Sequence, residues 1–347
     1  MKRVAADNKG EIDIFMPPVP ATRNGKRVAL IGAGPASLTV ARDLMPLGYH
    51  VVLFEKDRMG GGLMRTNIPS FRLPAGVLDE EVDLIVNMGV EARFGHEIKS
   101  MKALLAEGFD AVFVGTGAPK GKELDLPGRH ETDQIFIGIE WLESIHFGHV
   151  DSVGKRVLII GVGNTAMDCC RSAKRLGATD VKVISRKTRK YFKASPWELE
   201  DAEEEQVDIL ENLSPVRFVI ENGKLTGMEF DRFTSREENG KLIQDPAGRI
   251  TLPCDSVVLA IGQENAFPWI ERDLGIEFRQ RGNHGMTHSA YVSDPDGNGI
   301  EVLYELAEDV WVGDVNAALN YWDPMPTDGE ASLTDRLENP EFSRSPA

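Results

Sequence analysis

Short apolar runs, several of them followed by a glycine-rich turn, recur along the first three-quarters of the chain. The run RVALI at residues 27–31 leads into the turn GAGPAS and then into LTVARDLMPLG, whose apolar residues have helical spacing. A second apolar run, HVVLFE, ends in Glu55. Uninterrupted apolar runs of this length are typical of strands buried in a parallel sheet. The pattern predicts a strand, a glycine turn, a helix and a second strand that ends in an acid.

The same order of elements returns from Lys155 onward. The run RVLII precedes the turn Gly161–Asn164, a helix is predicted to about Leu176, and the next strand, VKVIS, leads into the basic pair Arg186 and Lys187. Between the two copies, FDAVFVGTG predicts a further strand that ends at a glycine turn. Two such copies in one chain predict an α/β fold with two Rossmann-like dinucleotide-binding domains.

The second copy continues into a helix and a β-rich segment. The acidic stretch WELEDAEEEQVDI predicts a helix with a solvated acidic face and with Trp197 and Leu199 turned inward. Short alternating strands follow, namely VRFVI, a turn at Asn222–Gly223, LTGMEF and a β-rich insert to Ile250. The segment CDSVVLAIG then predicts a buried strand that ends at Gly262.

The first glycine turn has the spacing that a dinucleotide requires. Gly32 allows a tight turn, and Gly34 lets backbone amides approach a pyrophosphate at the start of a helix. Glu55 follows Gly34 by 21 positions, where a carboxylate can accept hydrogen bonds from a ribose. Ser37 occupies the place of the third glycine, and this departure is expected to loosen the packing of the helix on the strand.

A second glycine-rich block, GGGLMRTNIPSFRLP at residues 60–74, is interpreted as a loop around the flavin end of FAD. Three glycines after a strand also suit an ordinary loop, so the interpretation depends on the motif before it. The later turn Gly115–Gly117 is expected to return the chain to the cofactor. The residues predicted to bind FAD are Gly32, Gly34, Pro35, Ala36, Glu55, Gly61, Gly62, Leu63, Arg72, Thr116 and Gly117.

The second glycine turn predicts a site for a different dinucleotide. A carboxylate at the end of the following strand would bind the ribose of NAD, whereas Arg186 and Lys187 suit the 2′-phosphate of NADP. A solvated basic patch is the alternative. On the helix between them, Asp168 is expected to make a structural hydrogen bond and Cys169 and Cys170 to pack. The residues predicted to bind NADPH are Gly161, Gly163, Asn164, Thr165, Arg186 and Lys187.

The composition of the chain limits which partners and which cellular compartment are expected. The 347 residues carry a net charge of −16, which argues against a nucleic-acid surface and against anionic membranes. No stretch has the roughly 18 apolar residues of a membrane span, and the first residues lack the apolar core of a secretory signal. The three cysteines form no dithiol, zinc or iron–sulfur pattern. We expect a cytoplasmic protein with no nucleic-acid or membrane partner.

Several segments, in the same order, resemble the small (beta) subunit of NADPH-dependent glutamate synthase and related FAD/NAD(P)-binding oxidoreductases. They are VALIGAGPASL, GGLMRTNIPSFRLP, DAVFVGTGAP, VLIIGVGNTAMDCCRSAKRLGA, SRKTRKYFKASPWELEDAEEE and LAIGQ, within residues 25–278. The resemblance implies FAD and NADPH as cofactors, hydride transfer between them, and electrons passed to a protein acceptor. That acceptor would be an iron–sulfur protein, a ferredoxin or a larger synthase subunit. No catalytic side chain is assigned, because positioning of the cofactors carries such a step.

The sequence departs from that family at both ends. The family carries an N-terminal domain with cysteine-bound iron–sulfur clusters, and MKRVAADNK resembles only its last stretch, without cysteines. Near residues 279–283, the expected Gly-Gly-Asp and long helix give way to HGMTHSAYVSDPDGNGIEVLYE. That segment resembles the last strands of a vicinal oxygen chelate (glyoxalase and extradiol dioxygenase) module. Gly313–Asp314 is therefore interpreted as unrelated to the flavin closure.

The C-terminal segment is predicted to contain a β-hairpin and no metal. Asp294–Gly297 predicts a chain reversal between two strands. Glu301 could bind a metal together with His284 or His288, but such a site needs about three protein ligands, and only a fragment of the module is present. Asp323 to Ala347 are expected to be poorly ordered.

The predicted organisation has five parts. They are a linker remnant of the iron–sulfur domain (1–24), an FAD-binding domain (25–148), an NADP-binding domain (149–262), a partial return to the FAD domain (263–282) and the hairpin-containing appendage (283–347). Two other functions stay open. One is a nucleotide-binding remnant or scaffold that holds little cofactor. The other, ranked last, is a metal-dependent lyase or dioxygenase based on the C-terminal fragment.

Overall fold

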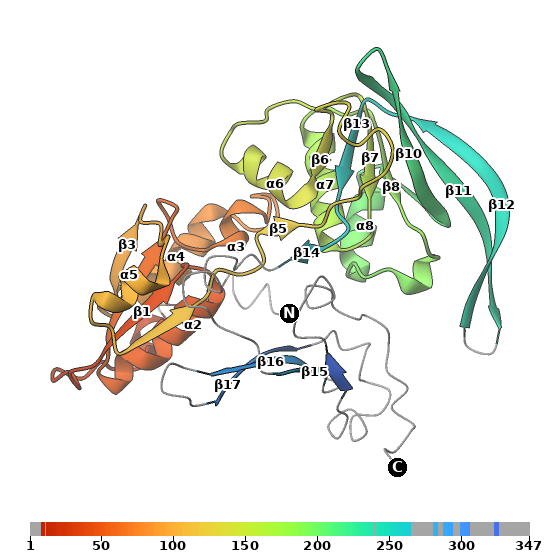
Figure 1. Ribbon diagram of the computed structural model, residues 1–347. Helices are drawn as coiled ribbons and strands as arrows, with labels where there is room; N and C mark the ends of the chain where they lie inside the picture. Colours follow the sequence, from red (N-terminus) through yellow and green to blue (C-terminus); the bar gives the residue numbers. More distant parts are fainter. Residues whose placement is uncertain are drawn as a thin grey trace. The chain divides into compact units, whose positions relative to one another are not determined.

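The computed structural model describes residues 8–10, 12–238 and 241–264, and strands at 280–283, 287–293, 299–305 and 323–325 (Figure 1). Contacts divide the chain into two compact units, Met1–Ile98 with Leu105–Ala266 and Lys99–Leu104 with Phe267–Ala347. Within these described ranges, no helix is both long enough and apolar enough to cross a membrane.

The first parallel sheet has the strand order β3-β2-β1-β4 and confirms the first predicted copy. Its strands are β1 (Arg27–Ile31), β2 (His50–Glu55), β3 (Glu91–Phe94) and β4 (Ala111–Val114). The helices α2 (Pro35–Leu44) and α4 (Ala75–Val86) share a buried core with β1 and β2. Because β1 pairs in parallel with both β2 and β4, the turns that follow these three strands emerge at one edge of the sheet.

The second parallel sheet has the order β6-β13-β7-β8-β9. Its strands are β6 (Ile135–Ile137), β7 (Arg156–Ile160), β8 (Asp180–Ile184), β9 (Asp208–Leu210) and β13 (Ser256–Leu259). Val157 and Ile159 of β7 pack in a core with the helix α7 (Asn164–Arg175). Leu158 and Ile160 pack with residues of the neighbouring antiparallel sheet. A strand with an unbroken apolar sequence therefore serves two layers, because its side chains alternate between faces.

The antiparallel sheet has the order β10-β11-β12 and lies between β9 and β13 in sequence. Its strands are β10 (Leu213–Glu221), β11 (Lys224–Glu238) and β12 (Lys241–Pro253). The predicted turn at Asn222–Gly223 joins β10 to β11, and both residues have positive φ, as a two-residue hairpin turn requires. β11 pairs with β12 beyond the last residue paired to β10, so a long two-stranded hairpin projects from the sheet (Figure 1).

The remaining elements are short. They are η1 (Asp13–Phe15), η2 (Met45–Leu47), α3 (Leu63–Thr66), α5 (Met101–Ala106), α6 (Gly138–His146), η3 (Arg189–Tyr191), α8 (Pro196–Glu204), β5 (Lys120–Gly121) and β14 (Gln263–Glu264). β5 precedes the second parallel sheet and β14 follows it, and the two pair in antiparallel fashion. The two segments that lead into and out of this sheet are thus hydrogen-bonded to each other.

The helix α8 corrects one prediction. Leu199 is buried as expected, but Trp197 is 64% exposed and Glu198 is only 4% exposed. The inward stripe of α8 consists of Glu198, Leu199 and Ala202, and Trp197 lies just outside it. The physical reason is that the carboxylate of Glu198 has an arginine partner inside, which an acidic run considered alone does not reveal.

In the second unit, residues 280–325 include an antiparallel sheet of order β17-β16-β15-β18. Its strands are β15 (Gln280–Asn283), β16 (Thr287–Ser293), β17 (Gly299–Glu305) and β18 (Asp323–Met325). β16 and β17 pair in antiparallel fashion on either side of the predicted reversal. The prediction of poor order from Asp323 onward differs from the structure at the three residues of β18, which pair with β15. His284, Gly313–Asp314 and residues 326–347 lie outside the described residues.

Candidate functional site

Three glycine loops meet beyond the carboxyl ends of β1, β2 and β4. The amide of Gly32 donates to the carbonyl oxygen of Phe54 at 2.8 Å, and a Cβ on Gly32 would stand 2.7 Å from the carbonyl oxygen of Gly115. A Cβ on Gly62 would stand 2.9 Å from Cα of Gly34. Backbone approaches this close are open only to glycine. The structure therefore brings the predicted FAD residues of all three loops together.

Glu55 fixes the first of these loops. Its side chain is buried at the end of β2, where Oε2 accepts from the amide of Ala33 at 2.6 Å and Oε1 accepts from the amide of Asp57 at 3.0 Å. A carboxylate has about four lone-pair positions, so each oxygen keeps capacity for one further donor. Glu55 is thus oriented by the backbone and still able to accept a ribose hydroxyl.

The helix α2 begins without a side-chain cap. Gly34 is its N-cap, Pro35 is its first residue and Ala36 follows, so no side chain competes for the first amides. Such a helix end favours a phosphate, through unpaired N–H groups and the helix dipole. Thr116, in the third loop, has a buried hydroxyl with no hydrogen-bond partner among the described residues. The first amides of α2 and the hydroxyl of Thr116 are thus both available to a ligand in this region.

The side chain of Ser37 fits tightly, and this corrects the expected loosening of the motif. Ser37 is fully buried on α2. A Cβ on Gly115 would lie only 2.1 Å from Oγ of Ser37. The missing side chain at Gly115 therefore supplies the room that a third glycine in the motif would otherwise supply.

The second glycine turn follows β7 with the same construction. The amide of Gly161 donates to the carbonyl oxygen of Ile184 at 3.0 Å, and a Cβ on Gly161 would meet the carbonyl oxygen of Ala260 at 2.2 Å. Gly163 is the N-cap of α7, and a Cβ there would have nothing within 4 Å. Open space thus lies beside the start of α7. The next residues are the exposed Asn164, whose Oδ1 accepts from the amide of Ser195 at 2.9 Å, and the half-buried Thr165.

The basic turn after β8 divides its cations into two groups. Arg189 is ion-paired to Glu203, and Nζ of Lys190 lies 2.6 Å from Oε2 of Glu237. Arg186 and Lys187 are exposed, and among the described residues neither side chain pairs with a carboxylate. The predicted 2′-phosphate residues are therefore the two cations of the turn that have no carboxylate partner among the described residues.

Arg72 lies apart from the FAD loops. Its Nη1 donates to Oδ1 and Oδ2 of Asp168 at 2.8 and 2.7 Å, and its Nη2 lies 2.5 Å from Oε1 of Glu198. Burial raises the pKa of Asp168 to about 6, against the opposing effect of Arg72. The contact expected for Asp168 is present as an ion pair. Glu198 was missed, and no local signal in the acidic run pointed to it.

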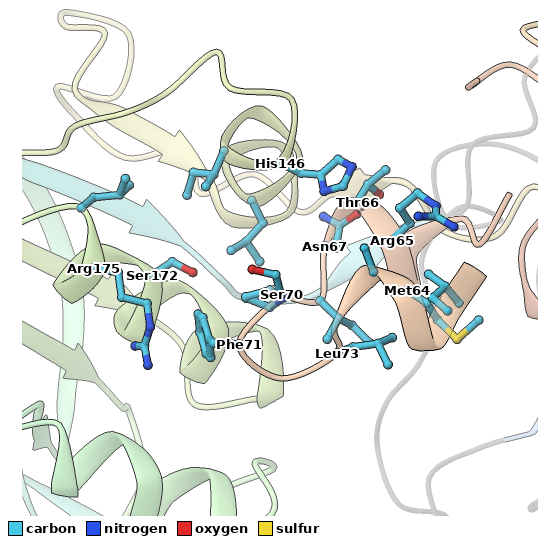
Figure 2. A pocket seen from close by; sticks show the side chains of 17 residues that line it. Met64, Arg65, Thr66, Asn67, Ser70, Phe71, Leu73, His146, Ser172 and Arg175 are labelled. Carbon is cyan, nitrogen blue, oxygen red and sulfur yellow. Dashed lines mark hydrogen bonds between the residues drawn. The ribbon is translucent and has the colours of Figure 1, made fainter. Parts of the chain in front are cut away.

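A cavity of about 300 Å³ lies beside α3, and none of the residues predicted to bind a cofactor lines it. Figure 2 shows Met64, Phe71 and Leu73 among its apolar lining residues, together with Ser172 of α7 and His146 at the end of α6. It is formed by residues 64–71 and Leu73 of the flavin-type glycine block, by the start of α4, and by residues of α6 and α7 or next to them. Apart from the glycine block itself, no sequence pattern predicted this cavity.

The three cysteines are inaccessible in the fold. All three cysteines are buried and free, and burial raises the pKa of Cys170 and of Cys254 to about 12 and that of Cys169 well above its ordinary value. Within the part of the chain that the structure describes, no group of three His, Cys, Asp or Glu residues could hold a metal ion. The side chains of His288 and Glu301 lie outside that part.

Known proteins match this chain over most of its length. The beta subunit of an NADPH-Fe(3+) oxidoreductase from Geobacter sulfurreducens is 34% identical over 290 residues, which are 80% of this chain and 43% of that protein. The beta subunit of the NADP(+)-dependent formate dehydrogenase of Moorella thermoacetica is 37% identical over 272 residues, covering 76% and 38%. The glutamate synthase (NADPH) small chain of Halomonas elongata is 36% identical over 278 residues, covering 75% and 58%. The chain spans less than half the length of the first two relatives.

Solved structures share the fold at low sequence identity. FprA of Mycobacterium tuberculosis, in complex with NADPH, has a TM-score of 0.61 at 16% identity and covers 73% of both chains. Thioredoxin reductase of T. acidophilum has a TM-score of 0.52 at 18% identity, over 72% of this chain and 81% of that one. A family model described as pyridine nucleotide-disulphide oxidoreductase matches residues 26–296. With two Rossmann-like sheets and the glycine turns in place, the chain belongs to the pyridine nucleotide-disulphide oxidoreductase family.

Proposed function

We propose that this chain binds FAD and NADPH, passes a hydride from NADPH to FAD, and delivers electrons to a protein acceptor. The observation that carries the proposal is the contrast between two dinucleotide-type turns of the same construction. The first is followed by a buried acid, Glu55, and the second by two cations, Arg186 and Lys187, that have no carboxylate partner among the described residues. An acid suits a ribose with free hydroxyls, and cations suit a ribose that carries a phosphate.

The residues of the first sheet fit FAD. The uncapped start of α2 offers amides for a pyrophosphate, and Glu55 retains acceptor capacity for a ribose. The buried hydroxyl of Thr116 lacks a partner among the described residues, and a bound cofactor would satisfy it. We assign Gly61, Gly62, Leu63 and Gly117 to the same site because their loops touch the first one. Arg72 is held by carboxylates and is a weaker candidate.

The residues of the second sheet fit NADPH. The space beside Gly163 would admit a pyrophosphate at the start of α7, with Asn164 and Thr165 beside it. Arg186 and Lys187 would hold the 2′-phosphate, because a phosphate with two exposed cations nearby makes strong charge-assisted hydrogen bonds. The same argument favours NADPH over NADH as the donor.

Bound nicotinamide and flavin rings supply the hydride donor and the hydride acceptor of such a reaction. The chain's own residues bind the two cofactors and hold their orientation. No side chain is given an acid–base role, since a hydride transfer requires none.

The acceptor is proposed from the kind of proteins that the chain resembles. The three relatives are a small chain and two beta subunits of oxidoreductases. An iron–sulfur protein, a ferredoxin or a larger synthase subunit would accept the electrons. We also propose a cytoplasmic location, with no nucleic-acid or membrane partner, from the composition and the net charge of −16.

The test is a visible absorption spectrum of the purified protein, followed by anaerobic addition of NADPH and, separately, of NADH. A flavin band that bleaches faster with NADPH supports the proposal. Protein that stays colourless after FAD addition and desalting contradicts it and favours the nucleotide-binding remnant. Elemental analysis of the same sample tests the metal-dependent alternative, which requires stoichiometric iron, manganese or nickel.

A further inference from the structure

The long hairpin of β11 and β12 reaches the basic turn after β8. Gln244 of β12 donates through Nε2 to the main-chain carbonyl oxygen of Arg186 at 2.7 Å. On the neighbouring strand, Glu237 of β11 pairs with Lys190. Two side chains from the two strands therefore hold the turn at two points, one at each end of the stretch 186–190.

The contact from Gln244 is itself supported. Its Nε2 also lies 3.4 Å from Oδ1 of Asn212 and from Oγ of Ser235, and the Ser235 hydroxyl donates to the same Asn212 oxygen at 2.5 Å. The amide of Phe233 donates to the carbonyl oxygen of Asn212 at 3.0 Å. This small polar network joins the hairpin to the chain between β9 and β10 and fixes the direction of the Gln244 amide.

The inner side of the turn is anchored separately. The buried hydroxyl of Ser185 accepts from the amide of Lys187 at 3.1 Å and donates to the Lys187 carbonyl at 2.8 Å. Ser185 thus controls the backbone at Lys187, and Gln244 controls it at Arg186. The restraint on Arg186 comes from the hairpin, which lies outside the Rossmann-like sheet. It is therefore not part of the nucleotide-binding motif.

The hairpin also affects which cations are free. Glu237 neutralises Lys190, and Glu203 of α8 neutralises Arg189. Arg186 and Lys187 are left as the positive charges of the turn that have no carboxylate partner among the described residues. A phosphate that enters the turn is therefore directed to these two side chains and away from the later ones.

We propose that the β11–β12 hairpin determines the nucleotide selectivity of the second site, with Gln244 as the residue that positions Arg186 for a 2′-phosphate. This inference rests on the proposed NADPH function and goes beyond it, because it assigns selectivity to a segment outside the glycine motif. A fixed backbone at Arg186 reduces the conformational entropy that the turn loses when its guanidinium binds a phosphate.

The test measures equilibrium binding of 2′,5′-ADP and of 5′-AMP to the full chain by calorimetry, with no redox step. In Gln244→Ala, affinity for 2′,5′-ADP is expected to fall about three- to tenfold, as for the loss of one hydrogen bond. Affinity for 5′-AMP is expected to stay within about twofold, since that ligand lacks the second phosphate. Thr234→Ala is the matched control, because Thr234 is exposed, pairs with Asp245 beside Gln244, and faces away from the turn.

A double-mutant cycle separates positioning from general weakening of the fold. If Gln244 acts through Arg186, Gln244→Ala has little further effect on 2′,5′-ADP binding in an Arg186→Ala background. Equal losses in both backgrounds, or equal losses for both ligands, would overturn the proposal. If the wild-type chain binds 2′,5′-ADP no more tightly than 5′-AMP, the NADPH assignment itself fails. A clear wild-type preference that Gln244→Ala leaves intact contradicts only the role of the hairpin.

Discussion

Arg72 and Asp168 are joined by two hydrogen bonds from a single guanidinium nitrogen, although 96 positions separate them in sequence. The second terminal nitrogen of Arg72 reaches Glu198. Both carboxylates are almost fully buried, with side-chain exposures of 7% and 6%. The segment between α3 and α4 is thereby held to two helices of the second sheet through one partly buried cation. Removal of one member of such a pair leaves an uncompensated buried charge.

Asp168 should give the protein a pH-dependent stability of unusual sign. Its pKa is raised from 3.8 to about 6, chiefly by burial, so the folded chain holds this proton more tightly than the unfolded chain. The group stabilises the fold below about pH 4, and that contribution is lost as pH rises to about 6. Each unit of pKa difference corresponds to about 1.4 kcal/mol. Chemical unfolding should be measured for wild type and Asp168→Asn across this pH range. As pH rises, the free energy of unfolding of wild type should fall relative to that of Asp168→Asn.

Glu203→Gln provides the comparison of opposite sign. Its hydrogen bond to Arg189 holds the pKa of Glu203 below the usual range. Its stabilising contribution is therefore present above about pH 4.5 and lost as pH falls. A difference curve for Asp168→Asn that is flat from pH 4 to 6, or that runs in the same direction as the curve for Glu203→Gln, would show that burial does not dominate at Asp168.

Gly163→Ala should remove NADPH binding and leave the fold intact. A Cβ at Gly163 has nothing within 4 Å, so the cost in stability is that of a poorer N-cap, about 1 kcal/mol or less. The added methyl would occupy the space beside α7 that we assign to the pyrophosphate. Binding should be measured by calorimetry with NADP⁺, and retained flavin absorbance is the internal control.

Gly161→Ala is the matched variant in the same turn. Gly161 has φ +122°, and a Cβ there would lie 2.2 Å from the carbonyl oxygen of Ala260. We expect a loss of about 2 kcal/mol or more in the free energy of unfolding. Equal thermal stability of the two variants would contradict this geometry. Unchanged NADP⁺ affinity in Gly163→Ala would argue against a pyrophosphate at the start of α7.

Arg186→Ala and Lys187→Ala should each weaken binding of NADPH much more than binding of NADH. Loss of a charge-assisted hydrogen bond to a phosphate corresponds to a fall in affinity of about ten- to a hundredfold. Arg189→Ala is the control, because Arg189 is already paired with Glu203. Fluorescence titration with both nucleotides checks the result. An Arg189→Ala effect as large as that of Arg186→Ala would mean that the phosphate lies further along the turn.

The thiols should be unreactive in the folded protein. All three cysteines are buried, and burial raises the pKa of Cys170 and Cys254 to about 12. Since the thiolate is the reacting form, a thiol reagent at pH 8 should label none of them within minutes and all three after unfolding in denaturant. Rapid labelling of one native cysteine would revive a thiol-based redox role.

The fold was predictable where its signal lies in adjacent residues. Apolar runs ending in glycine turns indicated β1, β4 and β7, apolar runs ending in charged residues indicated β2 and β8, and Asn222–Gly223 indicated the first hairpin turn. The contrast between an acid at Glu55 and a cation at Arg186 was likewise predictable from the sequence. Each residue lies at or just after the end of a strand, so the position of the strand determines its own.

Features that depend on distant partners were not predictable. Trp197 was expected inside and Glu198 outside, because nothing near α8 in sequence reveals that Arg72 lies beneath it. The contact of Gln244 with the Arg186 carbonyl depends on how far the hairpin extends past β10, which strand propensities do not determine. The cavity beside α3 depends likewise on packing between segments remote in sequence.

Ser37 and Gly115 impose an order on the substitutions that this chain can accept. While Ser37 is present, any side chain at position 115 meets its hydroxyl at 2.1 Å. Replacing Ser37 by glycine first would restore the third glycine of the motif, and the nearest contact of an alanine Cβ at 115 would then be the ring of Phe113, at 3.0 Å. In the reverse order, the intermediate carries both side chains in one space. The two positions are thus epistatic, because the route that replaces Ser37 first avoids the closest contact and the other route requires the Ser37 hydroxyl to move.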